Sequence, residues 1–254
     1  MTLLRRVLTP VAFGALVLLV WQLAVDLQDI PGYLLPSPTA IWEQVHENAS
    51  DILDVTVASG LNALIGLLVG IVLAVVVAVL AVWVPVLQRL LTPLASGVAA
   101  MPIVALAPVL FIMFAADSDL PRRIVVTVVA FFPVFVTTVR GLTRIEPVHA
   151  ELLRSYAASA WETTRVVRLP GAVPYLFTGV RVASSLAVIS AVVAEYFGGL
   201  QNGLGSRITS AASNTAYARA WAYVVAAIGL GLVFYVVSLG AERLATRGRA
   251  VEQA

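Results

Sequence analysis

The reactive side chains of this chain are few, and the missing types exclude several chemistries. Its sixteen basic residues are all arginine, and it contains neither Lys nor Cys. A P-loop needs a lysine that reaches the nucleotide phosphates, and Schiff-base enzymes need a lysine amine, so a conventional ATPase is excluded. The two histidines, His46 and His149, lie far apart in the sequence, which argues against a histidine metal site. The sequence therefore predicts no catalytic residues and no metal ligands.

One acid, Glu195, stands within the apolar stretch 172–197. A carboxylate in such a stretch is costly in a membrane and normally faces a bundle interior or water. At about 100° per residue, Ser184, Val188 and Ala191 fall on the same narrow helical stripe as Glu195. Two interpretations stay open. The stripe lines a water-accessible path between helices, or Glu195 lies at the outer interface and hydrogen-bonds to the loop 196–202.

The longest polar interval covers about residues 141–170. Leu152, Tyr156, Ser159 and Thr163 recur three or four residues apart, the spacing of one helical face, with charged residues on an adjoining face. Pro170 ends the segment. A short helix with apolar and charged faces serves either as a membrane-surface helix or as a docking element for a partner's groove.

The elements that must hold these residues are membrane helices. Of 254 residues, 60% are hydrophobic and 12% are charged, whereas soluble domains carry about 25% charged residues. Six apolar stretches have lengths near that of a membrane span: 7–25, 61–84, 98–116, 124–139, 172–197 and 221–240. The sequence therefore predicts an all-α membrane protein of about six transmembrane helices in a single domain, 1–254.

Several local patterns add detail to these helices. The spacing Gly66-x-x-x-Gly70 permits close approach of another helix, although a chance pair is an equal alternative. Prolines 102, 108 and 133 predict bends in the third and fourth helices. Residues 40–48 are expected to form a short interfacial helix on the outer side.

The distribution of arginine predicts the orientation. An even number of spans puts both termini on one side, and cytoplasmic termini place twelve of the sixteen arginines inside. The outer loops then receive Arg122, Arg123, Arg207 and Arg219, and Asp117 and Asp119 could offset the first two. We therefore expect a multi-pass protein of the inner or plasma membrane with cytoplasmic termini. A net charge of +2 is too small to imply nucleic acid.

The segment 151–170 resembles a family signature. Its residues are Glu151-Leu152-Leu153, three residues, Ala157, nine residues, then Val167-Arg168-Leu169-Pro170. This spacing resembles E-A-A, three residues, G, nine residues, I-x-L-P of the inner-membrane permease subunits of binding-protein-dependent ABC importers. Both alanines are replaced by Leu and the turn Gly by Ala157. A positive φ costs Ala more than Gly, so we expect either a turn with ordinary φ or a helix that bends without breaking.

The resemblance covers about residues 30–245 and includes Leu34-Leu35-Pro36-Ser37-Pro38 and Val193-Ala194-Glu195. Within the family the chain is most similar to the branch that imports sulfonates, taurine, nitrate or pyrimidine-type vitamin precursors. The resemblance implies the type I ABC importer permease fold. It also implies that the segment at about 141–170 is a cytoplasmic coupling helix that contacts an ATPase through these residues: Glu151, Leu152, Leu153, Arg154, Tyr156, Ala157, Ser159, Leu169 and Pro170.

The same resemblance implies the partners. Two ABC ATP-binding subunits would hold ATP and Mg, so this chain itself carries no cofactor. A second permease copy, favoured as a homodimer, would complete the pore, and an external binding protein would deliver a small-molecule solute.

Two other functions compete with this one. A self-contained channel or carrier should show an inverted repeat, and a membrane enzyme needs a nucleophile, base or metal cluster at depth; neither feature is recognisable.

Overall fold

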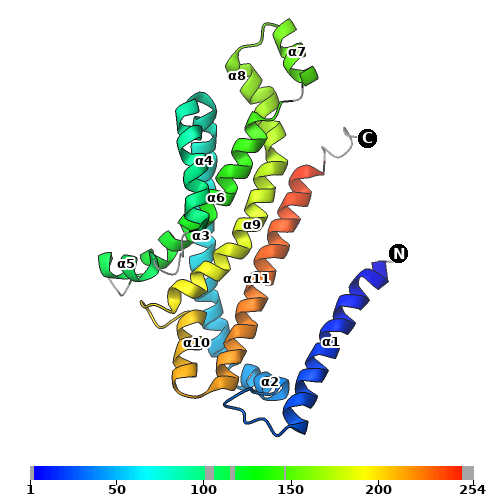
Figure 1. The fold of residues 1–254 in the computed structure, drawn as a ribbon, viewed down its shortest axis with the longest axis vertical. Helices are drawn as coiled ribbons and strands as arrows, with labels where there is room; N and C mark the ends of the chain where they lie inside the picture. The colour runs from blue at the N-terminus through cyan, green and yellow to red at the C-terminus, as the bar shows by residue number, and fades with distance from the viewer. Residues whose placement is uncertain (1–2, 101–105, 115–117, 146, 248–254) are drawn as a thin grey trace.

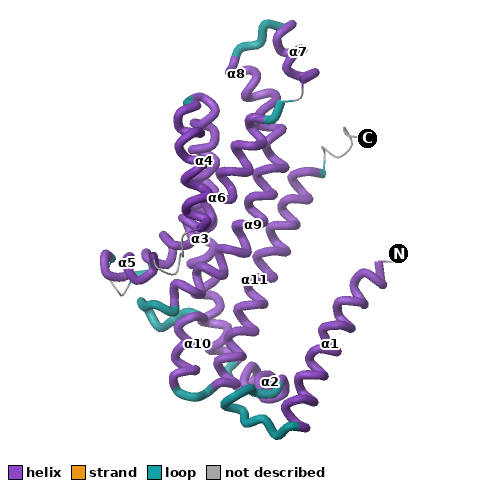
Figure 2. Tube along the Cα trace, in the orientation of Figure 1, coloured by secondary structure: helices purple, strands orange, loops and turns teal. Residues whose placement is uncertain are grey.

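The computed structural model describes residues 3–100, 106–114, 118–145 and 147–247. The regular elements of these ranges are all helices (Figures 1 and 2). In chain order they are α1 (Leu3–Leu27), α2 (Pro38–Glu47), α3 (Ala49–Trp83), α4 (Pro85–Ala100), α5 (Leu106–Met113), α6 (Leu120–Thr143), α7 (Pro147–Ser155), α8 (Ala160–Thr163), the π-helix η2 (Thr164–Arg168), α9 (Leu169–Glu195), α10 (Leu204–Ser213) and α11 (Tyr217–Thr246).

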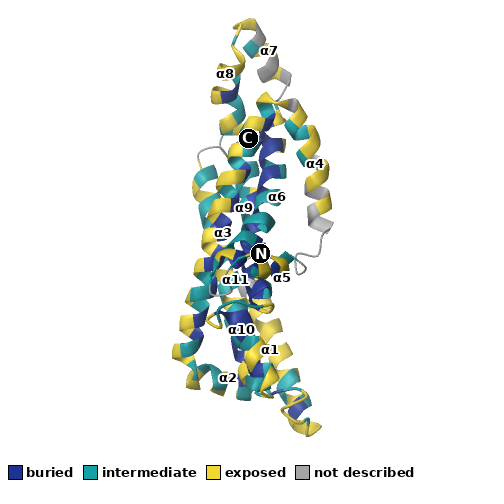
Figure 3. Cartoon of the chain, turned by 90° about the vertical axis from the view of Figure 1, so that its left-hand side faces the viewer, coloured by how far each residue is buried: buried dark blue, intermediate teal, exposed yellow. Residues whose placement is uncertain are grey.

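The long helices α3, α6, α9 and α11 run side by side along the long axis of the molecule (Figure 1). At one end of this bundle α7 and α8 project beyond it, and at the other end lie α2 and α10. α1 stands apart from the bundle, and its first turn and the last turn of α11 both point toward the α7 end. Figure 3 shows that the buried residues gather along α6 and α9.

Five helical segments of the described chain are long and apolar enough to cross a membrane. They are Leu8–Leu27, Ala49–Trp83, Leu120–Thr143, Ala160–Glu195 and Tyr217–Thr246. The predicted span 98–116 includes residues 101–105, with Pro102 among them, and 115–116, which lie outside the described residues. Its described parts are the end of α4, a helix that contacts α3 and α6, and α5, which contacts α6.

The close approach predicted from Gly66 and Gly70 joins α3 to α6. A Cβ on Gly66 would stand 2.5 Å from Cβ of Val126, and a Cβ on Gly70 would stand 2.9 Å from Cβ of Ala130. Both distances are shorter than van der Waals contact, so only glycine fits at these two positions. The glycine pair is therefore a packing feature of α3, and the chance interpretation is wrong.

Two helices at the end of the bundle opposite α7 extend the sequence expectation. α2 covers the predicted interfacial segment, with Ser37 as N-cap accepting a hydrogen bond from the Ala40 amide (3.2 Å) and Pro38 in the first turn. α3 begins at Ala49, twelve residues before the apolar stretch at 61. Asp51 in its first turn accepts hydrogen bonds from Arg207 (2.7 Å) and from the Tyr223 hydroxyl (2.6 Å). Hydropathy alone missed this polar helical start.

Candidate functional site

Seven of the nine predicted coupling residues, from Glu151 to Ser159, belong to the projecting tip formed by α7, α8 and the turn between them (Figure 1). Glu151, Leu152, Tyr156, Ala157 and Ser159 are exposed, and Leu153 is half-buried. The backbone of Arg154 lies in α7, but its side chain is outside the described part of the structure. The tip also exposes apolar side chains that the sequence interpretation did not select: Val148 is 72% exposed and Trp161 56% exposed.

The turn of the tip differs from both forms expected at Ala157. Helix α7 ends, and Ala157 takes a left-handed conformation with φ of 51°. The Ala158 amide donates to the Leu153 carbonyl (3.0 Å), the six-to-one bond of a Schellman cap. The expectations of an ordinary φ and of an unbroken helix are therefore both wrong. Ala157 takes the place of the usual glycine, because the cap bonds offset the cost of its Cβ.

A capping box starts the second helix of the tip. The Ser159 hydroxyl accepts from the Glu162 amide (3.2 Å), while the Glu162 carboxylate accepts from the Ser159 amide (2.7 Å). These reciprocal bonds fix where α8 begins. The predicted face from Leu152 through Ser159 to Thr163 is thus divided between two helices, and the expectation of one helix over this segment is wrong.

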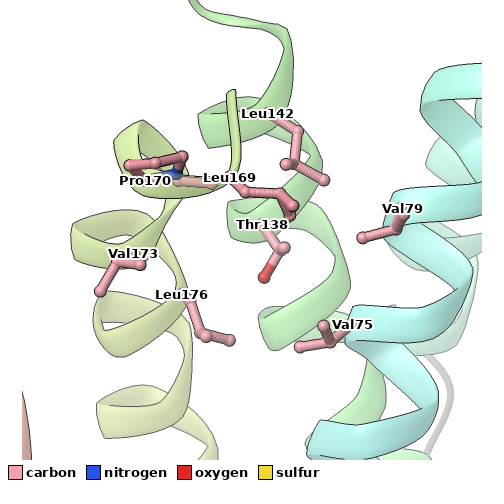
Figure 4. Close-up of a pocket in the computed structure, with 9 residues that line it drawn as sticks. Val75, Val79, Thr138, Leu142, Leu169, Pro170, Val173 and Leu176 are labelled. Carbon is pink, nitrogen blue, oxygen red and sulfur yellow. The ribbon is translucent and has the colours of Figure 1, made fainter. Parts of the chain in front are cut away.

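From Ala160 at the start of α8 to Glu195 at the end of α9, the chain is helical without interruption. η2 inserts a π-type turn, in which the Leu169 amide donates to the Thr164 carbonyl, and α9 follows directly. Trp161 lies beside Trp83 at the end of α3, with ring centroids 6.3 Å apart. The tip is therefore joined to the bundle by a continuous helix and by an aromatic contact. Leu169 and Pro170 lie beyond η2, where they line an apolar pocket rather than the exposed tip (Figure 4).

At the opposite end, Glu195 belongs to a buried polar cluster, which we call the outer cluster. Ser59 donates to the Glu195 carboxylate at 2.8 and 3.0 Å, and the Gly205 amide donates to it at 2.8 Å. Ser59 in turn accepts from the Leu204 amide (2.8 Å). Glu195 and Ser59 together satisfy two free amides at the start of α10, where the helix dipole also favours a negative charge. A Cβ on Gly203 would overlap the Glu195 carboxyl group.

The outer cluster continues along the first turn of α6. Arg122 is fully buried and donates to Asp119 (3.2 Å), to the Asn202 side chain (2.8 Å) and to the Leu200 carbonyl. Asp119 is also 3.4 Å from Arg123, which donates to Asn62 (2.9 Å). The predicted offset of the two arginines by Asp119 is confirmed, and Asp117 lies outside the described residues. Of the four charged groups, Glu195 and Arg122 are buried and carry opposite charges, whereas Asp119 and Arg123 are partly exposed.

The predicted path residues on α9 are buried within the single chain. Ser184, Val188, Ala191 and Glu195 are each no more than 4% exposed. Ser184 lies 3.1 Å from Ser238 of α11, and Glu195 contacts Ser59 of α3. Neighbouring helices of the same chain therefore cover both ends of the stripe. The hydrogen bonds of Glu195 go to α3 and α10, and not to the loop 196–202 that the second of the two open interpretations named. The path role of the stripe stays a prediction.

Several residues of the outer cluster escaped the sequence interpretation. Ser59 and Asn62 are polar and three residues apart on one face of α3, next to a purely apolar run. The pattern Gly203-x-Gly205 indicates a turn, but the contact of this turn with Glu195 could not be predicted from the sequence spacing. Within the described residues, no group of three or more His, Asp or Glu side chains could hold a metal ion.

Comparison with known proteins agrees with this arrangement. Residues 66–249 match the family model described as binding-protein-dependent transport system inner membrane component. A probable ABC transporter permease protein of Haemophilus influenzae is 29% identical over 201 residues, which cover 79% of this chain and 81% of the relative. The riboflavin transport system permease protein RibX of Chloroflexus aurantiacus is 36% identical, covering 77% and 73%. The formylaminopyrimidine transport permease protein ThiX of Halalkalibacterium halodurans is 29% identical, covering 79% of both chains.

The fold, the projecting tip and these matches lead to one assignment. The matched region contains α6, α9 and α11 and the whole tip. The family consists of transporter permeases and is not a catalytic family, in keeping with the side chains that this sequence lacks. The chain belongs to the inner membrane components of binding-protein-dependent transport systems, and it is a multi-pass permease subunit of an ATP-driven ABC importer with the type I fold.

Proposed function

We propose that the tip of α7 and α8 is the surface on which an ABC ATP-binding subunit docks. The observation that supports this most directly is the apolar exposure of the tip, where Tyr156 is 77% exposed and Val148 72% exposed. Large apolar side chains at the end of a membrane bundle are costly in water and are typical of an interface. Glu151 and Arg154 supply the charged rim, and Leu152 and Leu153 the remaining apolar anchors.

The transporter contains two copies of this chain, two ATPase subunits that bind ATP and Mg, and an external solute-binding protein. The α7 end faces the cytoplasm together with both termini, because this orientation places most arginines inside. The outer cluster, α2 and α10 then face the binding protein. The chain has no Lys and therefore no P-loop lysine for the nucleotide phosphates, so ATP hydrolysis is left to the partner ATPase subunits.

The solute is small and polar. Relatives of 25–36% identity are named as permeases for riboflavin, formylaminopyrimidine, aliphatic sulfonates and taurine. Solutes of this kind need several hydrogen bonds. We place their path between two copies of the chain, along α9. The stripe from Ser184 to Glu195 is covered by α3 and α11 within the single chain, so it lines this path only where those helices move away from α9.

Site-directed cross-linking tests the docking surface. The chain has no native Cys, so Tyr156→Cys carries the only thiol, and Glu43→Cys on exposed α2 is the matched control at the other end. A short cross-linker is expected to join Tyr156→Cys, and not Glu43→Cys, to a copurifying ATPase subunit. If no ATPase copurifies, or if only the control becomes cross-linked, the tip is not the docking surface.

A further inference from the structure

An apolar pocket of about 330 Å³ lies between α3, α6 and α9, near the α7 end of the bundle (Figure 4). Val75 and Val79 line it from α3, Leu142 from α6, and Leu169 and Val173 from α9. All of these side chains are aliphatic. The pocket is separate from the exposed tip and from the outer cluster, and neither of those sites explains it.

A single hydroxyl group points into this pocket. Thr138 is 3% exposed, and its Oγ1 has no hydrogen-bond partner among the residues that the structure describes. Figure 4 shows the oxygen directed into the space between the three helices. Other threonines of α6 behave differently: Thr137 and Thr143 each donate to a backbone carbonyl four residues earlier, at 2.8 and 2.9 Å. A buried hydroxyl without a partner is costly, so an occupant with one acceptor fits here.

The chemistry of the walls selects the kind of occupant. A bound water needs two to four polar partners, and the lining offers only the Thr138 hydroxyl. The solutes named for the relatives are polar and need several partners, which this lining also lacks. A hydrocarbon chain that carries an ester carbonyl matches both features, because aliphatic walls surround the chain and Thr138 donates to the ester.

Two arginines are close in sequence to lining residues at the α7 end of the pocket, although neither lines the pocket itself. Arg168 directly precedes Leu169, and Arg144 follows Leu142 by two residues. Arg144 donates to the Tyr175 hydroxyl (2.9 Å), and the buried Nε of Arg168 has no hydrogen-bond partner among the described residues. Neither arginine forms a salt bridge to a carboxylate in the described part of the chain. Basic groups at the end of a pocket between membrane helices favour an anionic lipid headgroup.

We propose that this pocket holds an acyl chain of one anionic phospholipid from the leaflet on the α7 side. The ester oxygen accepts from Thr138, and the phosphate lies at Arg144 and Arg168. This lipid joins the first turn of α9, directly after η2, to α3 and α6. The site is independent of the solute path and of the ATPase contact.

Lipid retention by the full chain, purified from membranes with its accompanying subunits, tests the proposal. The protein is delipidated, mixed with vesicles of equal phosphatidylglycerol and phosphatidylcholine, and analysed by native mass spectrometry. Val75→Phe fills the pocket, whereas Val76→Phe on the exposed side of α3 is the matched control. Arg168→Gln removes a headgroup partner, and Arg165→Gln, exposed in η2, is its control.

The wild-type chain is expected to retain phosphatidylglycerol in preference to phosphatidylcholine, and Val75→Phe to lose it while Val76→Phe keeps it. Arg168→Gln should weaken phosphatidylglycerol binding about fivefold, and Arg165→Gln should not. Thr138→Val should weaken retention without lowering the stability of the delipidated protein, because it removes an unpartnered hydroxyl at constant shape.

Three results would overturn the assignment. Equal retention of the two lipids would exclude an anionic headgroup site. Equal losses in Val75→Phe and Val76→Phe would indicate unspecific lipid around the bundle. Dissociation of two chains in Val75→Phe, with lipid retention unchanged, would identify a second copy as the occupant. Should Val75→Phe fail to fold, unchanged retention in both Thr138→Val and Arg168→Gln would reject the proposal.

Discussion

Ala157 supports the tip at a single backbone position. Its φ of 51° is one that glycine adopts freely and that costs a residue with a Cβ about 1–2 kcal/mol. The family signature has glycine here, yet the Schellman bond from Ala158 to Leu153 and the capping box at Ser159 hold the turn on both sides. The tip therefore keeps its shape although it lacks the residue best suited to it.

Replacing Ala157 by Gly should stabilise this turn by about 1 kcal/mol, because glycine removes the steric cost of the left-handed conformation. Slower hydrogen exchange of the amides from 156 to 160 measures the effect. Ala158→Gly is the control, since Ala158 is not among the residues with positive φ. Equal protection in both variants would mean that the left-handed turn does not limit local opening.

Glu195 is a second residue with a structural role, because its carboxylate joins α9 to α3 and α10. Glu195→Gln keeps the shape but places an amide opposite the donors Ser59 and Gly205. We expect a loss of about 1–3 kcal/mol, the range for hydrogen bonds to charged groups, seen as a lower melting temperature in detergent. Glu43→Gln on the exposed face of α2 should leave the melting temperature unchanged.

Uptake by the same variant separates the two interpretations of Glu195. If Glu195 only anchors α10, transport per folded molecule stays at the wild-type rate once expression is matched. If it also lines the path, solute affinity changes as well. A melting temperature equal to that of the wild type would contradict the anchoring role.

At the scale of helices, the close packing of α3 against α6 depends on glycine. Gly66→Ala would put a methyl group 2.5 Å from Val126 and 2.9 Å from the Arg123 carbonyl. Backbone cannot yield as a flexible side chain can, so we expect a destabilisation of about 1–3 kcal/mol and a lower yield of folded protein.

Gly229→Ala in α11 is the matched control for this change. A Cβ at Gly229 meets no atom within 4 Å, and alanine favours the helix by about 1 kcal/mol. Thermal unfolding of both variants in the same detergent should therefore move in opposite directions. Equal shifts would show that the close approach of α3 and α6 contributes nothing to stability.

The membrane helices could be predicted from the sequence because hydropathy is a local property. α2, the close glycine pair and the pairing of Asp119 with the two arginines followed from short-range patterns. The contact between Ser59 and Glu195 joins residues 136 positions apart, and no period in the sequence reports it. The left-handed conformation of Ala157 was not predicted, because the cap bonds on both sides outweigh the preference of alanine for a negative φ. The π-helix η2 was not predicted, because its sequence pattern is that of an ordinary helix.

The orientation of the whole molecule has a direct test. A thiol reagent that cannot cross the membrane is expected to label Glu43→Cys on α2 in intact cells and to miss Arg247→Cys after α11, because most arginines lie on the α7 side. Both sites are exposed in the structure. Labelling of Arg247→Cys alone would show that the orientation is the opposite of the one proposed. Permeabilised cells give the reference for full labelling.

The uninterrupted helix from Ala160 to Glu195 makes the molecule a lever. Its 36 residues span about 54 Å at about 1.5 Å per residue. A rod of this length that tilts by about 10° around its middle moves its two ends by about 5 Å in opposite directions. Trp161 stands at one end, and Glu195, tied to α10, at the other. A displacement of the tip is therefore expected to move the α10 end by a similar distance in the opposite direction, so that the bundle would widen at one end as it narrows at the other.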